Sequence, residues 1–139
     1  MKQQDLFIFS LLPTLFGIFV LVLAGMTSAW LVFQILLLVL LLCLWWWLGR
    51  WCAQHDLAFW RGFALLQGAG MLSVVLAALP SLGSFYLLGQ VYGNCGGVLL
   101  AFIPGLSSLS FFAALCALFT FCLTSVGYVL GFSSTRKRV

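Results

Sequence analysis

Charged residues are scarce in this sequence. They make up 6% of its 139 residues, whereas 65% are hydrophobic, and in soluble domains roughly a quarter of all residues are charged. No charged residue occurs between Asp5 and Arg50, and none occurs between Arg61 and Arg136. This composition excludes a soluble globular domain. Each uncharged interval is long enough for bilayer-spanning segments of about 20 residues, so we expect at least two helical hairpins.

Ligands for a metal and groups for catalysis are also few. The chain has one histidine, and its five cysteines include no Cys-x-x-Cys pair. Cys52 and His55 are three residues apart, but a zinc site takes about three or four protein ligands. His55 and Asp56 are adjacent, and neighbouring side chains do not normally point at each other or at a shared nucleophile. We therefore expect no metal, no other cofactor and no enzyme activity.

Four apolar segments account for most of the chain. They predict spans at about residues 6–24, 29–49, 59–79 and 108–132 in a single transmembrane domain covering residues 1–139. The runs are continuous and rich in leucine, which favours helices over strands. The first segment is longer than the apolar part of a secretory signal, so we interpret it as a retained helix in which Pro13 introduces a kink. The predicted fold is an all-α integral membrane protein with four transmembrane helices arranged as two hairpins.

The few basic residues predict the topology. With four spans, Lys2, the loop containing Arg50 and Arg61, and the basic residues 136–138 all lie on one side of the membrane. Basic residues are enriched on the cytoplasmic side, so both termini are expected to be cytoplasmic. The formal charge of +4 is thus a topology signal, and we expect no nucleic-acid partner. A bacterial cytoplasmic membrane is the predicted location.

The segment at residues 80–107 is harder to place. It carries no charge and contains the Gly-rich stretch GQVYGNCGG at residues 89–97. We expect a re-entrant or interfacial segment on the outer face, with irregular backbone sheltered from lipid by protein. Ion filters are built from such backbone carbonyls, but the preceding sequence makes a poor pore helix. The candidate functional residues here are Gln90, Tyr92, Asn94 and Cys95.

Five of the six tryptophans lie in WWWLGRWCAQHDLAFWRG, residues 45–62. Consecutive residues are about 100° apart around a helix, so three successive tryptophans would ring the helix end. Indole rings concentrate at the lipid headgroups, and arginine side chains extend from the apolar region to the headgroups. The pattern predicts a membrane anchor made of Trp45, Trp46, Trp47, Arg50, Trp51, Trp60 and Arg61.

Small and polar residues in the third and fourth spans indicate helix packing. Small residues four apart let two helix backbones approach closely, and Ala64 with Gly68 forms a mild version of this pattern. Hydroxyl and amide side chains can form hydrogen bonds between helices or line a polar path. The residues selected on these grounds are Gln67, Thr120, Thr124, Tyr128, Gly127 and Gly131.

The functional expectation follows from the absence of embedded charges and cofactor ligands. We expect an accessory, assembly, regulatory or immunity subunit that acts by helix packing on a larger membrane partner. The alternative is a homo-oligomeric channel or carrier for a neutral or weakly charged solute, lined by Gln67, Gln90, Asn94 and the Thr/Ser face of the last span. The expected partners are the lipid bilayer and either another membrane protein or further copies of the chain.

Overall fold

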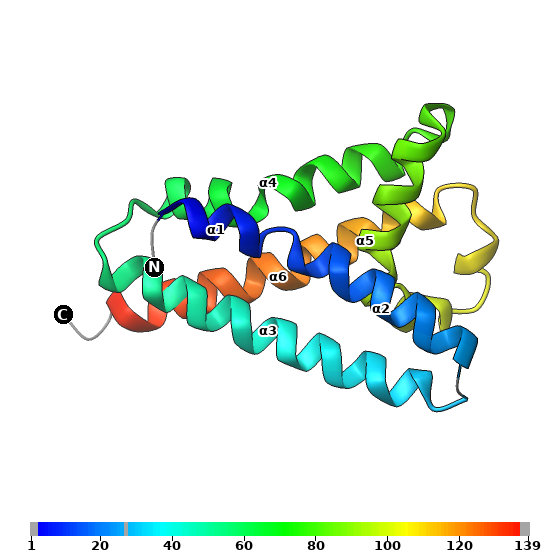
Figure 1. Ribbon diagram of the computed structural model, residues 1–139, viewed down its shortest axis with the longest axis horizontal. Coiled ribbons are helices and arrows are strands. Elements are labelled where there is room, and N and C mark those ends of the chain that lie inside the picture. Colours follow the sequence, from blue (N-terminus) through cyan, green and yellow to red (C-terminus); the bar gives the residue numbers. More distant parts are fainter. Residues whose placement is uncertain (1–2, 27, 137–139) are drawn as a thin grey trace.

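The computed structural model describes residues 3–26 and 28–136, and Figure 1 shows that they form a bundle of helices. Four stretches are long and apolar enough to cross a membrane, as predicted: Gln4–Met26, Leu31–Gln54, Phe59–Ala77 and Phe112–Thr135. The chain is therefore an all-helical, multi-pass integral membrane protein. Its elements are α1 (Gln3–Phe9), α2 (Leu12–Met26), α3 (Trp30–Gln54), α4 (Phe59–Ala77), η1 (Pro80–Leu82), α5 (Ser84–Ala101), η2 (Leu106–Ser108) and α6 (Phe112–Arg136).

The first apolar stretch is broken into α1 and α2. Pro13 has no backbone N–H to donate, and the helix is interrupted just before it, at Ser10 and Leu11. The Ser10 hydroxyl donates to the carbonyl oxygen of Phe7 at 2.6 Å. Because of the break, α1 packs on α4 while α2 packs on α5.

The main core lies between α3, α4 and α6. The side chains of Leu41, Trp45 and Leu48 from α3 are fully buried against Leu66 of α4 and Tyr128 of α6. Of all helix pairs, α3 and α6 form the most extensive contact. The α3–α6 pair is therefore the central unit to which the other helices are added.

Glycines bring the backbones of α3 and α6 into contact. A Cβ atom at Gly131 would overlap the carbonyl oxygen of Trp46, and one at Gly127 would lie 3.1 Å from the Cβ of Trp45. The Gly-x-x-x-Gly pair is thus used within the chain. Such small residues are the usual means by which transmembrane helices approach closely.

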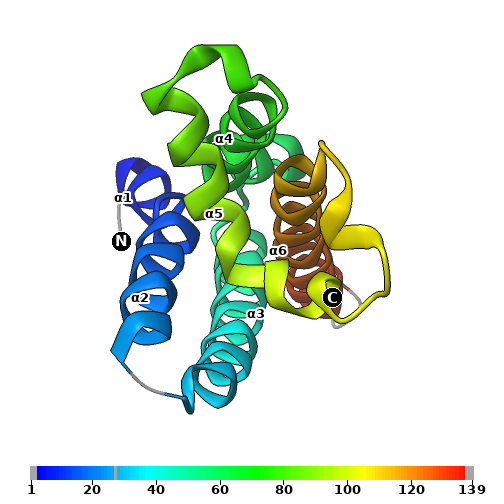
Figure 2. The same cartoon turned by 90° about the vertical axis from the view of Figure 1, so that its right-hand side faces the viewer.

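Helix α5 crosses the bundle in the half that lies opposite the chain ends, and in Figure 2 it passes between α2 and α6. It packs on α2, α4 and α6. A Cβ at Gly89 would lie 2.7 Å from the carbonyl oxygen of Ser73, and one at Gly93 would lie 2.9 Å from the backbone nitrogen of Ala117. The expectation of irregular backbone at residues 89–97 was wrong, because these residues belong to one continuous helix. The glycines instead allow neighbouring helices to pack closely against α5.

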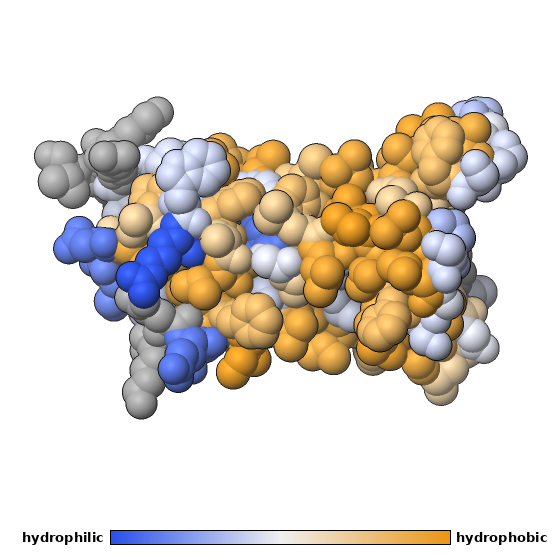
Figure 3. Space-filling model, turned by 90° about the horizontal axis from the view of Figure 1, so that it is seen from above, coloured by the Kyte–Doolittle hydropathy of each residue, from blue (hydrophilic) through white to orange (hydrophobic). Residues whose placement is uncertain are grey.

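Polarity differs between the two ends of the bundle. The start of α1, the end of α6 and the loop between α3 and α4 lie together at one end (Figure 1). Figure 3 shows the most hydrophilic side chains gathered at that end, beside a broad apolar band. The surface pattern is that of a bundle whose middle faces lipid.

Candidate functional site

The turn between α3 and α4 contains the His-Asp pair. The His55 ring donates from Nδ1 to the carbonyl oxygen of Trp51 at 2.9 Å and stacks on the Trp51 ring at a centroid distance of 4.1 Å. Asp56 has a positive φ of 51°, and the Leu57 N–H donates to the carbonyl oxygen of Cys52 at 3.0 Å. This is the Schellman arrangement that ends many helices. Both residues of the pair thus close the helix end, and no group of three or more metal-ligating side chains occurs among the residues that the structure describes.

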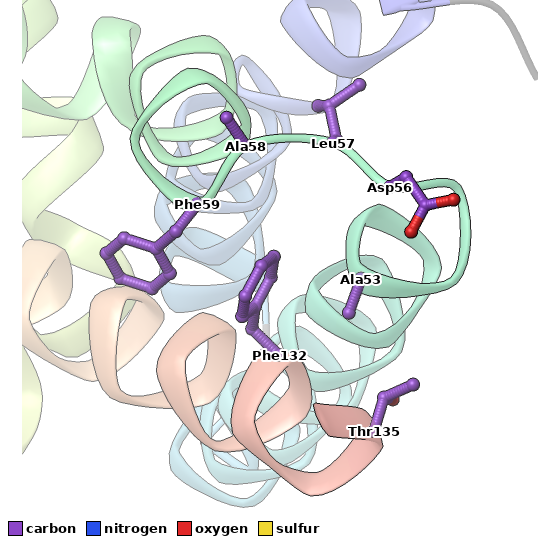
Figure 4. A pocket seen from close by; sticks show the side chains of 7 residues that line it. All are labelled: Ala53, Asp56, Leu57, Ala58, Phe59, Phe132 and Thr135. Carbon is purple, nitrogen blue, oxygen red and sulfur yellow. The ribbon is translucent and has the colours of Figure 1, made fainter. Parts of the chain in front are cut away.

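An open pocket of about 340 Å³ lies beside this turn (Figure 4). Its walls include the rings of Phe59 and Phe132, which meet edge to face at 5.2 Å. Asp56 supplies the one carboxylate of the described lining, and Thr135 supplies a hydroxyl. General acid–base catalysis needs a positioned acid and base, and this lining offers one carboxylate without a basic partner.

The predicted anchor residues divide into exposed and buried positions. Trp46 and Trp60 have 39% and 76% of their surface exposed, and the Arg50 guanidinium lies 4.8 Å from the centre of the Trp46 ring. Trp45 is fully buried, so its inclusion in the headgroup belt was wrong. The same angular spread that directs Trp46 outward directs Trp45 toward α6. The remaining predicted anchors are the exposed Trp47, the partly buried Trp51 and the exposed Arg61.

A buried polar cluster joins α4 to α6. The Gln67 Nε2 atom donates to the Thr124 hydroxyl at 3.0 Å and to the Ser125 hydroxyl at 3.2 Å. The Thr124 oxygen also lies 3.2 Å from Gln67 Oε1. Gln67 and Thr124 are buried, and the hydrogen bonds join them to each other. In the described structure their side chains thus pack the helices together.

Thr120 and Tyr128, on the same face of α6, are also buried and bonded within the chain. The Thr120 hydroxyl lies 3.0 Å from the carbonyl oxygen of Cys116, within α6 itself, and 3.4 Å from the carbonyl oxygen of Gly93 in α5, and it can donate to either. The Tyr128 hydroxyl donates to the carbonyl oxygen of Phe59 at 3.0 Å and so holds the start of α4. The polar residues selected from the sequence therefore do come together, and they form helix contacts.

Sequence reasoning missed Gln34 of α3. Its Nε2 atom donates to the backbone carbonyl oxygens of Asn94 at 2.7 Å and Cys95 at 3.3 Å, and so ties α3 to α5. Its Oε1 atom is buried with no hydrogen-bond partner among the described residues, as is the hydroxyl of Tyr92. The signal was present in the sequence, because Gln34 is the lone amide in a long apolar run.

A groove runs along α5 between α2 and α6, and we call it the α5 groove. It consists of two adjoining hollows of about 240 and 400 Å³ that share Leu21, Asn94, Phe112 and Cys116. Of the candidates from the outer segment, Gln90 and Asn94 line the groove, whereas Tyr92 and Cys95 are buried. Gln90 and Asn94 are therefore open to a ligand in the groove, whereas Tyr92 and Cys95 are packed inside the bundle.

A second small-residue pair remains unused. Ala64 on α4 is exposed, and a Cβ atom placed on Gly68 would have no atom within 4 Å. Gly127 and Gly131, by contrast, are buried against α3. The described chain therefore leaves one close-packing surface open, on α4.

No family model matches this sequence, and no match was found among curated proteins or among solved structures. The chemistry available to the molecule is therefore argued from its own geometry. The described residues offer helix-packing surfaces and, in the α5 groove, a pair of carboxamides.

Proposed function

We propose that this membrane protein acts by helix packing, as an accessory, assembly, regulatory or immunity subunit of a larger membrane partner. The observation that carries the proposal is the open pair on α4. Ala64 and Gly68 are one helical turn apart, and outside the local backbone of α4 no atom of the described residues would lie within 4 Å of a Cβ at Gly68. Helix α4 lies at the edge of the bundle in Figure 1. A helix of the partner can approach this strip closely, as transmembrane helices do at small residues.

The proposed topology places both termini and the α3–α4 loop in the cytoplasm, with the four spans as two hairpins. Arg50 and Arg61 lie at the same end of the bundle as the start of α1 and the end of α6. The positive-inside rule assigns that end to the cytoplasm. Helix α5 then lies toward the outer face of a bacterial cytoplasmic membrane, as an interfacial helix sheltered by α2, α4 and α6.

One observation favours the alternative, a homo-oligomeric channel or carrier for a neutral or weakly charged solute. Gln90 and Asn94 line an open groove, and carboxamides at several subunits could line a polar path. Against it, the side chains of Gln67 and Thr124 are buried and already form hydrogen bonds within the chain. We therefore place the channel second, and we propose no catalytic activity.

The test compares two leucine variants at open glycines. Gly68→Leu adds a bulky side chain on the proposed docking strip, and Gly25→Leu adds the same side chain at the end of α2, where a Cβ also has nothing within 4 Å. Tagged chains are extracted from native membranes in a gentle detergent, and bound proteins are identified by mass spectrometry. Wild type and Gly25→Leu should retain one distinct larger membrane protein. Gly68→Leu should recover at least about tenfold less of it, which corresponds to about 1.4 kcal/mol of binding.

The control for folding is the unfolding midpoint, which should be similar in both variants because a Cβ atom at either position meets none of the packed residues that the structure describes. Equal recovery by both variants would contradict docking on α4. Purified protein that carries a neutral solute across liposomes, and stops doing so as Asn94→Leu, would support the channel instead.

A further inference from the structure

The α5 groove has the properties of a ligand site. We propose that it binds one hydrocarbon chain whose head is an uncharged hydrogen-bonding group, such as the ester and hydroxyls of a monoacylglycerol. This site is separate from the α4 strip of the proposed function, because it is formed by α2, α5 and α6.

Two carboxamide side chains form the polar part of the α5 groove. Gln90 and Asn94 are four residues apart on α5, so they lie on one helix face and line the same hollow. The hydrogen bonds that join the described helices use the backbone carbonyl of Asn94, which accepts from Gln34, and neither carboxamide. A polar group among apolar neighbours loses free energy unless it finds a hydrogen-bond partner. A ligand that both donates and accepts would satisfy this pair.

The lining also sets the charge of the ligand. Among the described residues it contains no carboxylate, ammonium, guanidinium or imidazole. A charged head would therefore be taken out of water without an opposite charge to pair with, which is costly in apolar surroundings. Carboxamides can bind an ester, an amide or a hydroxyl without that penalty.

The size and walls favour a single chain over a protein helix. The larger hollow has a volume of about 400 Å³, at the small end of the range of about 300 to 1,000 Å³ for ligand pockets. A spherical hollow of that volume is about 9 Å across, whereas an α-helix with its side chains is about 10 to 12 Å wide. Leu21 and Phe112 supply apolar walls on either side of α5, which suits a hydrocarbon chain.

The experiment labels the purified full chain in nanodiscs with a monoacylglycerol that carries a photoactivatable diazirine on its acyl chain. Labelled peptides are then mapped by mass spectrometry. Ala24 is exposed and lines the smaller hollow of the groove, so Ala24→Trp obstructs that hollow from the surface. Val22→Trp is the matched control, because Val22 is exposed on the same helix and does not line the groove. Circular dichroism and gel filtration confirm that both variants fold.

In wild type and Val22→Trp, labelling should concentrate on residues 87–101 and 112–116. Ala24→Trp should reduce labelling of these residues at least about fivefold, and Asn94→Leu should reduce it about threefold or more, the scale of one hydrogen bond in a membrane protein. An unlabelled monoacylglycerol should compete better than the fatty acid of the same chain length.

Three results would overturn the proposal. One is equal labelling of Ala24→Trp and Val22→Trp, and another is better competition by the anionic fatty acid. The third comes from a photoreactive amino acid at position 24 in native membranes, if its adduct has the mass of a protein and not of a lipid. Because labelling uses the purified chain, its outcome is independent of whether a partner docks on α4.

Discussion

The contact between α3 and α6 can be tested by adding one methyl group. A Cβ at Gly131 would overlap the carbonyl oxygen of Trp46 and lie 2.8 Å from its carbonyl carbon. These are backbone atoms, so no side chain can rotate away, and Gly131→Ala must push the two helices apart. Overpacking typically costs about 1 to 3 kcal/mol, and the higher helix propensity of alanine returns up to about 1 kcal/mol. We expect a net loss of about 1 to 2 kcal/mol in the free energy of unfolding.

Gly68→Ala is the matched control for this prediction. The same methyl group is added within a helix, but nothing lies within 4 Å of it, so only the gain in helix propensity of up to about 1 kcal/mol remains. Unfolding is followed by tryptophan fluorescence as sodium dodecyl sulfate is titrated into mixed micelles. The two variants should differ by the overpacking cost of about 1 to 3 kcal/mol, because the gain in helix propensity is common to both. If Gly131→Ala is as stable as Gly68→Ala, the close α3–α6 contact does not exist in the folded chain. If Gly131→Ala instead dissociates an oligomer, the glycines serve contacts between chains.

Three further predictions concern the polar cluster, the helix end and the topology. Gln67→Leu should lower the free energy of unfolding by about 1 to 2 kcal/mol, since it removes several hydrogen bonds that average about 0.6 kcal/mol each in membrane proteins. In the Gln67→Leu background, Thr124→Val should lower the free energy of unfolding by less than it does in wild type. Additive losses in this double-mutant cycle would refute the coupling of the two side chains. Asp56→Gly should raise the free energy of unfolding by up to about 1 kcal/mol in the same titration. Asp56 has a φ of 51°, and glycine adopts that backbone region without a Cβ clash. A lower free energy of unfolding would contradict the positive φ at this turn. An impermeant thiol reagent on intact cells should label Ser81→Cys and not Gln54→Cys, both exposed and at opposite ends of the bundle; the reverse pattern would invert the topology.

The number of spans could be predicted because the bilayer imposes it. Uncharged intervals of that length have to cross the membrane as helices, which satisfy their own backbone hydrogen bonds. The break near Pro13 was also foreseeable, since proline removes a backbone donor wherever it occurs in a helix. These features depend on local composition, which the sequence displays directly.

Features that depend on which helices meet were not predictable. The glycines of residues 89–97 suggested irregular backbone, yet Gly89 and Gly93 lie in a regular helix. Glycine is needed at these two positions because α4 and α6 approach α5 closely there. Nothing in the sequence places Gln34 beside the carbonyl of Asn94, sixty positions away.

The sequence also could not decide which small-residue pair is internal. The same four-residue spacing occurs in two pairs, Gly127 with Gly131 and Ala64 with Gly68. Only the packing of the helices determines that α3 covers the first pair and that the second pair stays open. The three consecutive tryptophans present the same difficulty, since the burial of Trp45 depends on where α6 lies.

We propose that this chain docks on a larger membrane protein through α4. The most direct measurement is the native mass of the complex extracted from host membranes, taken for wild type and for Gly68→Leu. We expect the 15.3 kDa chain to be found with one distinct larger protein, and we expect Gly68→Leu to release it. A complex whose mass is a whole multiple of the chain alone, unchanged by Gly68→Leu, would contradict it.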